Sequence, residues 1–267
     1  MSLRDFGIVC DSGLKYTAGE EEIIIKFREQ FLAVKSKGFV QSHRSNNTGI
    51  GKTFEDLMSV KENNIPDVDF MNLIEIKSKR KDSESMLTLF TKSPEFPPNS
   101  NSYLKDRYGM PYENSNLKKL HTTISATKYN TFGDKIGFKL ECNDNDEKIH
   151  ILIHEQSTGK IIDRNVGYTY KTLKDIVSKK CANIAYVTAE SRINKAGKEE
   201  FKFTSAELLT GFTFEKFLKG IKSGKIKYDI RIGSYKSGKS YGKAHDHGSG
   251  FRIEKSEIPS FFTVTEL

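Results

Sequence analysis

The chain has 267 residues, of which 29% are charged and 36% hydrophobic, enough for one large domain or for two lobes that share a core. Three cysteines, an odd number without a C-x-x-C pair, argue against a disulfide framework and a structural zinc site. The N-terminus lacks the apolar core of a signal peptide, and no later run approaches the ~18 apolar residues of a membrane span, so we expect a soluble, cytoplasmic protein with no membrane partner.

The basic charge is concentrated near one end of the sequence. The formal net charge is +8, and residues 216–255 alone contain eleven Lys or Arg residues against three acidic ones. Because phosphate contacts need local positive potential, a neutral body with one basic segment is typical of a protein that binds a polyanion. A solvated lysine-rich surface is the alternative.

The first expected elements are two helices. Residues 19–37 have apolar residues at helical spacing, acidic residues in the first turn and lysines in the last, which predicts an amphipathic helix. A second helical stretch is expected from Thr53 to Val60, closed by Asn63, Asn64 and Pro66.

The middle of the chain predicts strands and one long loop. Residues 68–90 predict a strand, a charged break, and then a strand or the start of a helix. Residues 94–116 hold four of the six prolines and predict a long loop with a functional position. Residues 135–142 and 148–155 alternate apolar and polar side chains around a polar turn, which predicts a β-hairpin.

The last third of the chain predicts alternating strands and helices. The expected elements are a helix at 170–180, a buried strand at 183–191, a strand leading into a helix at 198–209, a basic helix at 212–225, and a strand at 227–235 that runs into a glycine-rich loop.

That glycine-rich loop contains GSYKSGKS, residues 233–240, which matches the phosphate-loop pattern G-x-x-x-x-G-K-[ST]. A working phosphate loop needs a helix directly after it, because the anion binds the free N–H groups of the helix N-terminus. Glycines at 242, 248 and 250 leave no room for three helical turns. We therefore expect no nucleoside triphosphate to bind.

The same segment carries residue types that contact DNA. Arg and His can donate to guanine N7 and O6, Asp can accept from cytosine N4, and Lys can hold phosphates. A zinc site is the alternative for the histidines, but the spacing fits no common zinc pattern and no cysteine is near. The candidate DNA-binding residues are Arg231, Tyr235, Lys239, Lys243, His245, Asp246, His247 and Arg252.

The candidate catalytic residues lie in PDVDFMNLIEIK, residues 66–77. In a strand, Glu75 and Lys77 share one face, and Asp69 can reach the same place if the chain bends before them. Two carboxylates suit Mg²⁺, which keeps several waters and bridges to substrate phosphate. Lys77 would orient the nucleophile and add positive charge, so the pattern indicates hydrolysis of a phosphodiester.

Six motifs lie in order along the chain: TGIGKTFEDL (48–57), DFMNLIEIK (69–77), MLTLFTKSP (86–94), DRYG (106–109), DIRIGSYKSGK (229–239) and GKAHDHGSGFRI (242–253). From residue 38 to residue 254 the sequence resembles the MvaI/BcnI family of type II restriction endonucleases, and its MvaI-type members most closely. The family belongs with MutH-like enzymes in the PD-(D/E)xK superfamily. The resemblance therefore implies a mixed α/β (α+β) fold, a central sheet flanked by helices, and two lobes that form a DNA-binding cleft.

The resemblance also assigns roles and boundaries. Asp69, Glu75 and Lys77 take the catalytic places, with Asp69 and Glu75 as metal ligands, and Glu55 takes the place of an additional acidic active-site residue. Asp67 is the alternative to Asp69, because this sequence has one extra residue before Glu75. The expected boundaries are an N-terminal extension at 1–40, a mainly catalytic lobe at 41–210 and a mainly DNA-recognition lobe at 211–267, interwoven in one compact unit.

The implied function is Mg²⁺-dependent cleavage of double-stranded DNA at a CC-N-GG pentanucleotide, with CCWGG favoured over CCSGG. Such enzymes act as monomers that nick each strand in turn, and a cognate DNA methyltransferase is expected to accompany them. Two alternatives stay open, a MutH-like repair nickase and a DNA-binding protein that reads its site without catalysis.

Overall fold

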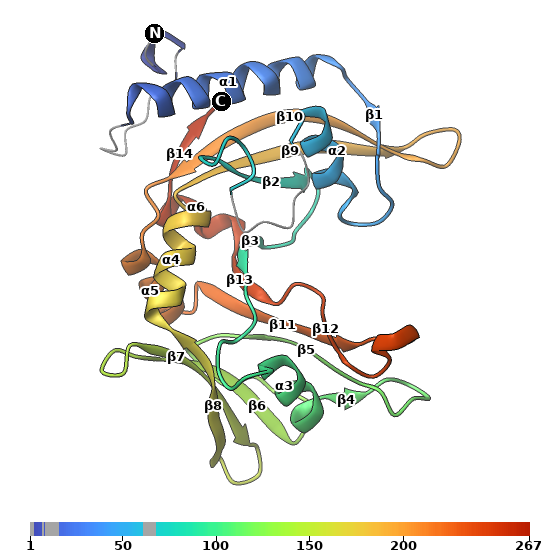
Figure 1. Cartoon of the computed structure of the whole chain (residues 1–267), viewed down its shortest axis with the longest axis vertical. Helices are drawn as coiled ribbons and strands as arrows, with labels where there is room; N and C mark the ends of the chain where they lie inside the picture. The colour runs from blue at the N-terminus through green and yellow to red at the C-terminus, as the bar shows by residue number, and fades with distance from the viewer. Residues whose placement is uncertain (1–2, 7, 9–15, 61–67) are drawn as a thin grey trace. The chain divides into compact units, whose positions relative to one another are not determined.

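The computed structural model describes the chain except for residues 1–2, 7, 9–15 and 61–67, and it divides into two compact units (Figure 1). Unit 1 consists of Met1–Ser85, Lys179–Thr213 and Pro259–Leu267, and unit 2 consists of Met86–Ser178 and Phe214–Ile258. Each unit is therefore assembled from segments that are distant in the sequence. These boundaries differ from those expected for the lobes, since residues 86–178 group with most of the basic C-terminal segment.

Unit 1 is built on a five-stranded sheet. Its strand order is β1 (Val40–Gln41), β10 (Glu199–Thr210), β9 (Asn183–Ile193) and β2 (Glu75–Arg80), and β14 (Thr263–Glu266) also pairs with β10. The long hairpin β9–β10 is antiparallel, whereas β2 pairs with β9 in parallel. This parallel pairing places the first residue of β2, Glu75, opposite Ile184.

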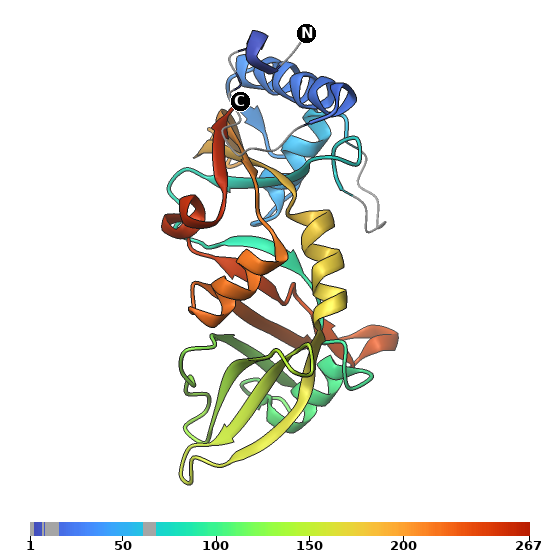
Figure 2. The ribbon, with the colours of Figure 1, turned by 90° about the vertical axis from the view of Figure 1, so that its left-hand side faces the viewer.

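Two helices pack against this sheet. α1 (Ala18–Ser36) contacts β10 and α2 (Gly49–Leu57) contacts β2, and Figure 2 shows α1 over the sheet from a second direction. The start of α1 is fixed by a capping box, in which Thr17 and Glu20 satisfy each other's free backbone N–H groups. Phe27 and Phe31 of α1 and Phe54 of α2 pack ring against ring in the buried core.

Unit 2 contains two further sheets. The larger has the order β3 (Leu87–Thr91), β13 (Gly250–Ile253), β11 (Ile226–Ser234), β5 (Lys118–Ile124) and β4 (Met110–Pro111), and β12 (Ala244–Asp246) pairs with β11. The smaller has the order β6 (Ile136–Asn143), β7 (Lys148–Glu155) and β8 (Ile161–Thr169).

The helices of unit 2 connect and cover these strands. They are α3 (Ser100–Tyr108), α5 (Phe214–Lys222) and α4 (Tyr170–Lys180), whose last two residues group with unit 1. Short turns complete the described elements: η1 (Leu3–Phe6), η2 (Gly238–Ser240), η3 (Lys255–Glu257) and α6 (Ile258–Phe261). The core around β11 and β13 is aromatic, with Tyr168, Tyr228 and Phe251 buried against one another.

Most elements expected from periodicity are confirmed. The N-terminal helix, the hairpin β6–β7, the helices α4 and α5, the buried strand β9 and the strand β11 all lie where the patterns place them. The GSYKSGKS segment ends in the short η2 turn and the strands β12 and β13 follow it, so strands stand where a phosphate loop requires a helix.

Three expectations were wrong in detail. The second helix begins at Gly49 rather than Thr53 and ends at Leu57; the residues expected to close it, 63, 64 and 66, lie outside the described part. Segment 94–116 contains α3 and β4 rather than loop alone. Residues 199–210 are strand throughout, because β10 pairs with β9 along its whole length.

Across the described residues, the structure holds no helix long and apolar enough to cross a membrane.

Candidate active site and candidate nucleic-acid interface

A tight turn bends the chain so that Asp69 reaches the start of β2. Phe70 and Ile74 form a β-bridge, and Met71 and Asn72 between them adopt left-handed backbone angles, with φ of 48° and 57°. The turn brings Asp69 Oδ2 to 2.8 Å from the backbone N of Ile76, which donates a hydrogen bond to it. The bend that the sequence required for Asp69 to join Glu75 and Lys77 is therefore present.

Glu75 is held by two ammonium groups. Its side chain is only 7% exposed, and its Oε1 accepts a hydrogen bond from Lys77 Nζ at 2.7 Å. Its Oε2 accepts from Lys180 Nζ, at the end of α4, at 2.9 Å. The buried carboxylate is thus compensated at both oxygens, as a charge removed from water requires.

The two carboxylates influence each other. Burial, and next the negative charge of Glu75, raise the pKa of Asp69, whereas the hydrogen bond from Ile76 and the charges of Lys77 and Lys180 oppose the rise. Two oxygen ligands that repel each other suit a divalent cation that keeps several waters. Within the described part of the chain, no group of three or more His, Cys, Asp or Glu side chains is arranged to hold a metal ion, so the pair would rely on water and phosphate for its other ligands.

Glu55, the additional acidic candidate, lies on α2, the helix that packs against β2. It therefore belongs to the same unit as Asp69, Glu75 and Lys77. Asp67, the alternative to Asp69, lies outside the described residues.

In unit 2, the buried side chain of Asp229 on β11 forms ion pairs with two arginines. Its Oδ2 lies 2.9 Å from Arg231 Nη2 and 2.8 Å from Arg252 Nε. The Arg252 contact is an ion pair without hydrogen-bond geometry. Thr123 of β5 donates a hydrogen bond to Asp229 Oδ1 at 2.6 Å. Arg252 is 12% exposed, whereas Arg231 is 47% exposed and can reach a ligand.

The His-Asp-His turn is fixed by its central residue. Asp246 Oδ1 accepts hydrogen bonds from the backbone N–H groups of Gly248 and Ser249, and its Oδ2 accepts from Ser93 and Asn101. Burial alone would raise the pKa of Asp246, but these hydrogen bonds outweigh it and lower the pKa. Asp246 thus holds the turn in place between His245 and His247.

Helix α3 anchors the neighbouring loop. Lys105 is 4% exposed, and its ammonium donates a hydrogen bond to the carbonyl of Gly242 at 2.7 Å. Asn101, one turn earlier, binds Asp246. Gly242, between η2 and β12, and Asp246, the last residue of β12, are therefore both tied to α3, which the sequence had suggested would be loop.

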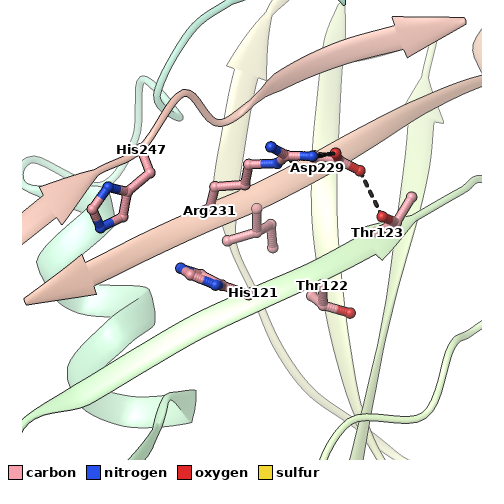
Figure 3. Close-up of a pocket in the computed structure, with 7 residues that line it drawn as sticks. His121, Thr122, Thr123, Asp229, Arg231 and His247 are labelled. Atoms are coloured by element: carbon pink, nitrogen blue, oxygen red, sulfur yellow. Dashed lines mark hydrogen bonds and ion pairs between the residues drawn. The ribbon is translucent and has the colours of Figure 1, made fainter. Parts of the chain in front are cut away.

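His121 of β5, Arg231 and His247 border a hollow of about 400 Å³ (Figure 3). His121 lies opposite Arg231 in the antiparallel pair β5–β11, so both side chains project from one face of the sheet. Burial first, and then neighbouring positive charges, lower the pKa of both His121 and His247. Neutral rings with one donor and one acceptor nitrogen are therefore favoured at this hollow.

The remaining candidates lie in the chain segment between β11 and His247, which borders this hollow. Tyr235 stacks on His245 with ring centroids 4.2 Å apart, and His245 lies 4.2 Å from His247. Lys239 and Lys243 are exposed in the glycine-rich loop. Tyr235, His245 and His247 thus form a chain of ring contacts, and Lys239 and Lys243 are exposed in the same segment.

Sequence reasoning missed three residues of these sites. Lys180 and His121 reach their partners through pairings of distant strands, and a lone Lys or His carries no local signal. Asp229 had a signal, since it is an acidic residue alternating with Arg231 on a predicted strand, where opposite charges on one face stabilise each other.

The mixed α+β fold is that of the PD-(D/E)xK restriction-endonuclease-like class. The MvaI/BcnI restriction endonuclease family model matches residues 28–262, and the chain belongs to that family. It is a site-specific nuclease, and restriction endonucleases of this kind generally use divalent metal ions.

Two solved structures show the same fold. The complex of restriction endonuclease MvaI with its cognate DNA is 36% identical, has a TM-score of 0.84, and is matched over 94% of this chain and 99% of that chain. Restriction endonuclease MvaI without DNA is 34% identical, has a TM-score of 0.61, and is matched over 95% and 100%. No match was found among curated proteins. Because only 5–6% of this chain stays outside these matches, part of residues 1–40 also belongs to the shared fold.

Proposed function

We propose that the chain is a Mg²⁺-dependent type II restriction endonuclease that hydrolyses DNA at a CC-N-GG pentanucleotide, with CCWGG favoured over CCSGG. The observation that carries the proposal is the cluster of Asp69, Glu75 and Lys77 at the start of β2, in a chain of the MvaI/BcnI family. The proposed preference for CCWGG rests on the resemblance of the sequence motifs to MvaI-type members of the family.

The proposed chemistry assigns one task to each residue of the cluster. Asp69 and Glu75 would hold Mg²⁺, which supplies a bound water of lowered pKa and neutralises charge on the phosphate oxygens. Lys77 holds Glu75 in place and adds positive charge where the phosphodiester is attacked. Glu55, on the adjoining helix, is the proposed additional acidic residue of this site.

The proposed recognition is carried by unit 2. Arg231, His245 and His247 would contact base edges in the major groove, and Lys239 and Lys243 would contact phosphates. Tyr235 supports His245 by stacking. Asp246 and Arg252 were candidates for base contacts too; their buried pairings favour a role in holding this surface in shape.

The proposal includes the mode of action expected for the family. The enzyme would act as a cytoplasmic monomer, would nick the two strands of its site in turn, and would be accompanied by a DNA methyltransferase that protects the same sequence.

The test is a digest of three otherwise identical plasmids that carry one CCWGG site, one CCSGG site or neither, prepared without methylation. With Mg²⁺, we expect nicked circles followed by linear DNA from the CCWGG plasmid alone, and no cleavage in EDTA. Cleavage of the CCSGG plasmid alone would show that the enzyme recognises CCSGG instead of CCWGG. Equal cleavage of all three plasmids would refute a specific site.

Two further outcomes separate the alternatives. Nicking that never proceeds to linear DNA, or that needs a partner protein, would indicate a MutH-like repair nickase. Tight, site-selective binding without any cleavage would indicate a DNA-binding protein that has lost catalysis.

A glycine beside the hollow provides a test of the recognition surface. A Cβ added to Gly233 would lie 2.7 Å from both His247 Nε2 and Tyr112 Oη, so alanine there must displace these rings. We expect Gly233→Ala to reduce the preference for the cognate duplex over random DNA by about tenfold or more, with little change in non-specific binding. Competition binding measures this ratio, and Gly19→Ala, where a Cβ meets nothing within 4 Å, is the control.

A further inference from the structure

Lys180 is a second lysine in the proposed catalytic cluster, and the strand order of the sheet places it there. It ends α4, three residues before β9 begins at Asn183. Because β9 pairs in parallel with β2, with Ile184 opposite Glu75, the residues just before β9 lie beside the start of β2. Lys180 and Glu75, 105 residues apart in sequence, therefore meet at 2.9 Å.

The contact fixes the orientation of Glu75. Lys77 occupies Oε1 and Lys180 occupies Oε2, so the carboxylate is held at both ends rather than at one. With Lys77 alone, the carboxylate could rotate about its last bond, since that terminal torsion is broad. A carboxylate that is fixed in advance presents its oxygens in one geometry, which is what a reaction that depends on position requires.

Lys180 also changes the charge of the site. Ionised Asp69 and Glu75 together with Lys77 would leave one net negative charge on these three side chains, and the ammonium of Lys180 balances it. A net negative site would repel the DNA backbone, and this repulsion is strongest where water is excluded.

We propose that Lys180 is a positioning residue of the active site, which orients Glu75 through Oε2 and balances the charge of the carboxylate pair so that DNA can approach. This inference rests on the proposed function of Asp69, Glu75 and Lys77. Lys180 has the further property of competing with a divalent cation for Glu75, because its ammonium occupies an oxygen that the cation would use.

The test uses Lys180→Met, Lys180→Arg and, as a matched control, Lys179→Met, which removes the same charge from the exposed neighbouring residue. Single-turnover cleavage at saturating Mg²⁺ is expected to slow by about 10- to 100-fold in Lys180→Met, because a misplaced ligand weakens the catalytic geometry. Lys180→Arg keeps the charge and is expected to recover most of that loss. Lys179→Met is expected to cleave at the unmodified rate.

A second readout does not depend on activity. Calorimetric titration with Ca²⁺, which has the same preference for oxygen ligands, is expected to give binding that is about threefold or more tighter in Lys180→Met, because the competing ammonium is gone. A lysine that merely supported the fold would, when removed, weaken Ca²⁺ binding and lower the thermal unfolding midpoint together with the rate.

The inference is overturned if Lys180→Met cleaves as fast as Lys179→Met, or if it binds Ca²⁺ less tightly than the unmodified chain. Glu75→Ala separates this failure from failure of the proposed function. If Glu75→Ala is inactive and Lys180→Met is fully active, only the proposed role of Lys180 is refuted. If Glu75→Ala is active, the assignment of the catalytic residues is refuted.

Discussion

Replacement of Glu75 by alanine is expected to abolish DNA cleavage, with a loss in single-turnover rate of about a thousandfold or more. The substitution removes one of the two carboxylates proposed to hold Mg²⁺ and leaves Lys77 and Lys180 without the partner that both of them bind. Lys77→Ala is expected to have a similar effect, because it removes positive charge from the site of attack. The measurement is cleavage of pre-bound cognate duplex after addition of Mg²⁺.

Binding of the same duplex in EDTA should be retained in both variants, since the proposed base contacts come from unit 2. Lys79→Ala is the matched control, because Lys79 lies two residues further along β2 and its ammonium lies 4.1 Å from the Tyr186 ring centroid rather than against Glu75. This control is expected to cleave normally. A Glu75→Ala protein that still cuts at its site would refute the assignment of Asp69, Glu75 and Lys77 as the catalytic cluster.

Replacement of Asp229 by alanine is expected to lower the free energy of unfolding by about 3–5 kcal/mol, because it leaves the buried guanidinium of Arg252 without its counter-charge. The Thr123 hydroxyl loses its acceptor at the same time. Arg231, freed from its ion pair, is expected to lose its fixed orientation, so site-specific binding should fall as well. Urea unfolding followed by tyrosine fluorescence measures the first effect, and competition binding measures the second.

Glu254→Ala is the control for that experiment. Glu254 pairs with Lys227 at the surface, where an ion pair contributes only about 1 kcal/mol or less. If Asp229→Ala were no more destabilising than Glu254→Ala, the Arg231, Arg252 and Asp229 cluster would be a set of exposed charges rather than a buried support for the proposed recognition surface.

The sequence predicted the strand that carries Glu75 and Lys77 because its signals are local. Alternation along residues 74–77 places Glu75 and Lys77 on one face, and two residues with left-handed backbone angles in the turn before them supply the bend for Asp69. The hairpin β6–β7 and the helix α1 were likewise predictable, because a turn or a cap marks each boundary in the sequence.

Other elements depend on contacts that no local pattern contains. Residues 205–209 favour a helix by composition, but Leu208 lies between Ala185 of β9 and Thr265 of β14, and pairing on both sides overrides that preference. At Gly49, a Cβ would lie 2.3 Å from the carbonyl oxygen of Arg44. The lack of a side chain at Gly49 is therefore what permits the backbone to approach Arg44 there.

In the candidate sites, too, some residues could be predicted from local patterns and others depend on contacts between distant segments. Lys180 and His121 join their clusters only after β9 pairs with β2 and β5 pairs with β11. The segment 94–116 was expected to be loop because of its prolines and polar residues, yet Lys105 and Asn101 within it form a helix that anchors the glycine-rich segment.

The assembly of unit 1 from three separate segments has a consequence for the order of events during synthesis. Strand β14 forms the edge beside β10, and Leu267 donates its backbone N–H to the carbonyl of Ala206. A nascent chain that has not yet reached residues 263–267 cannot make these contacts, although Asp69, Glu75 and Lys77 left the ribosome long before. The unit that holds the candidate catalytic cluster is thus completed only after the entire glycine-rich segment that is proposed to select the DNA site has been made.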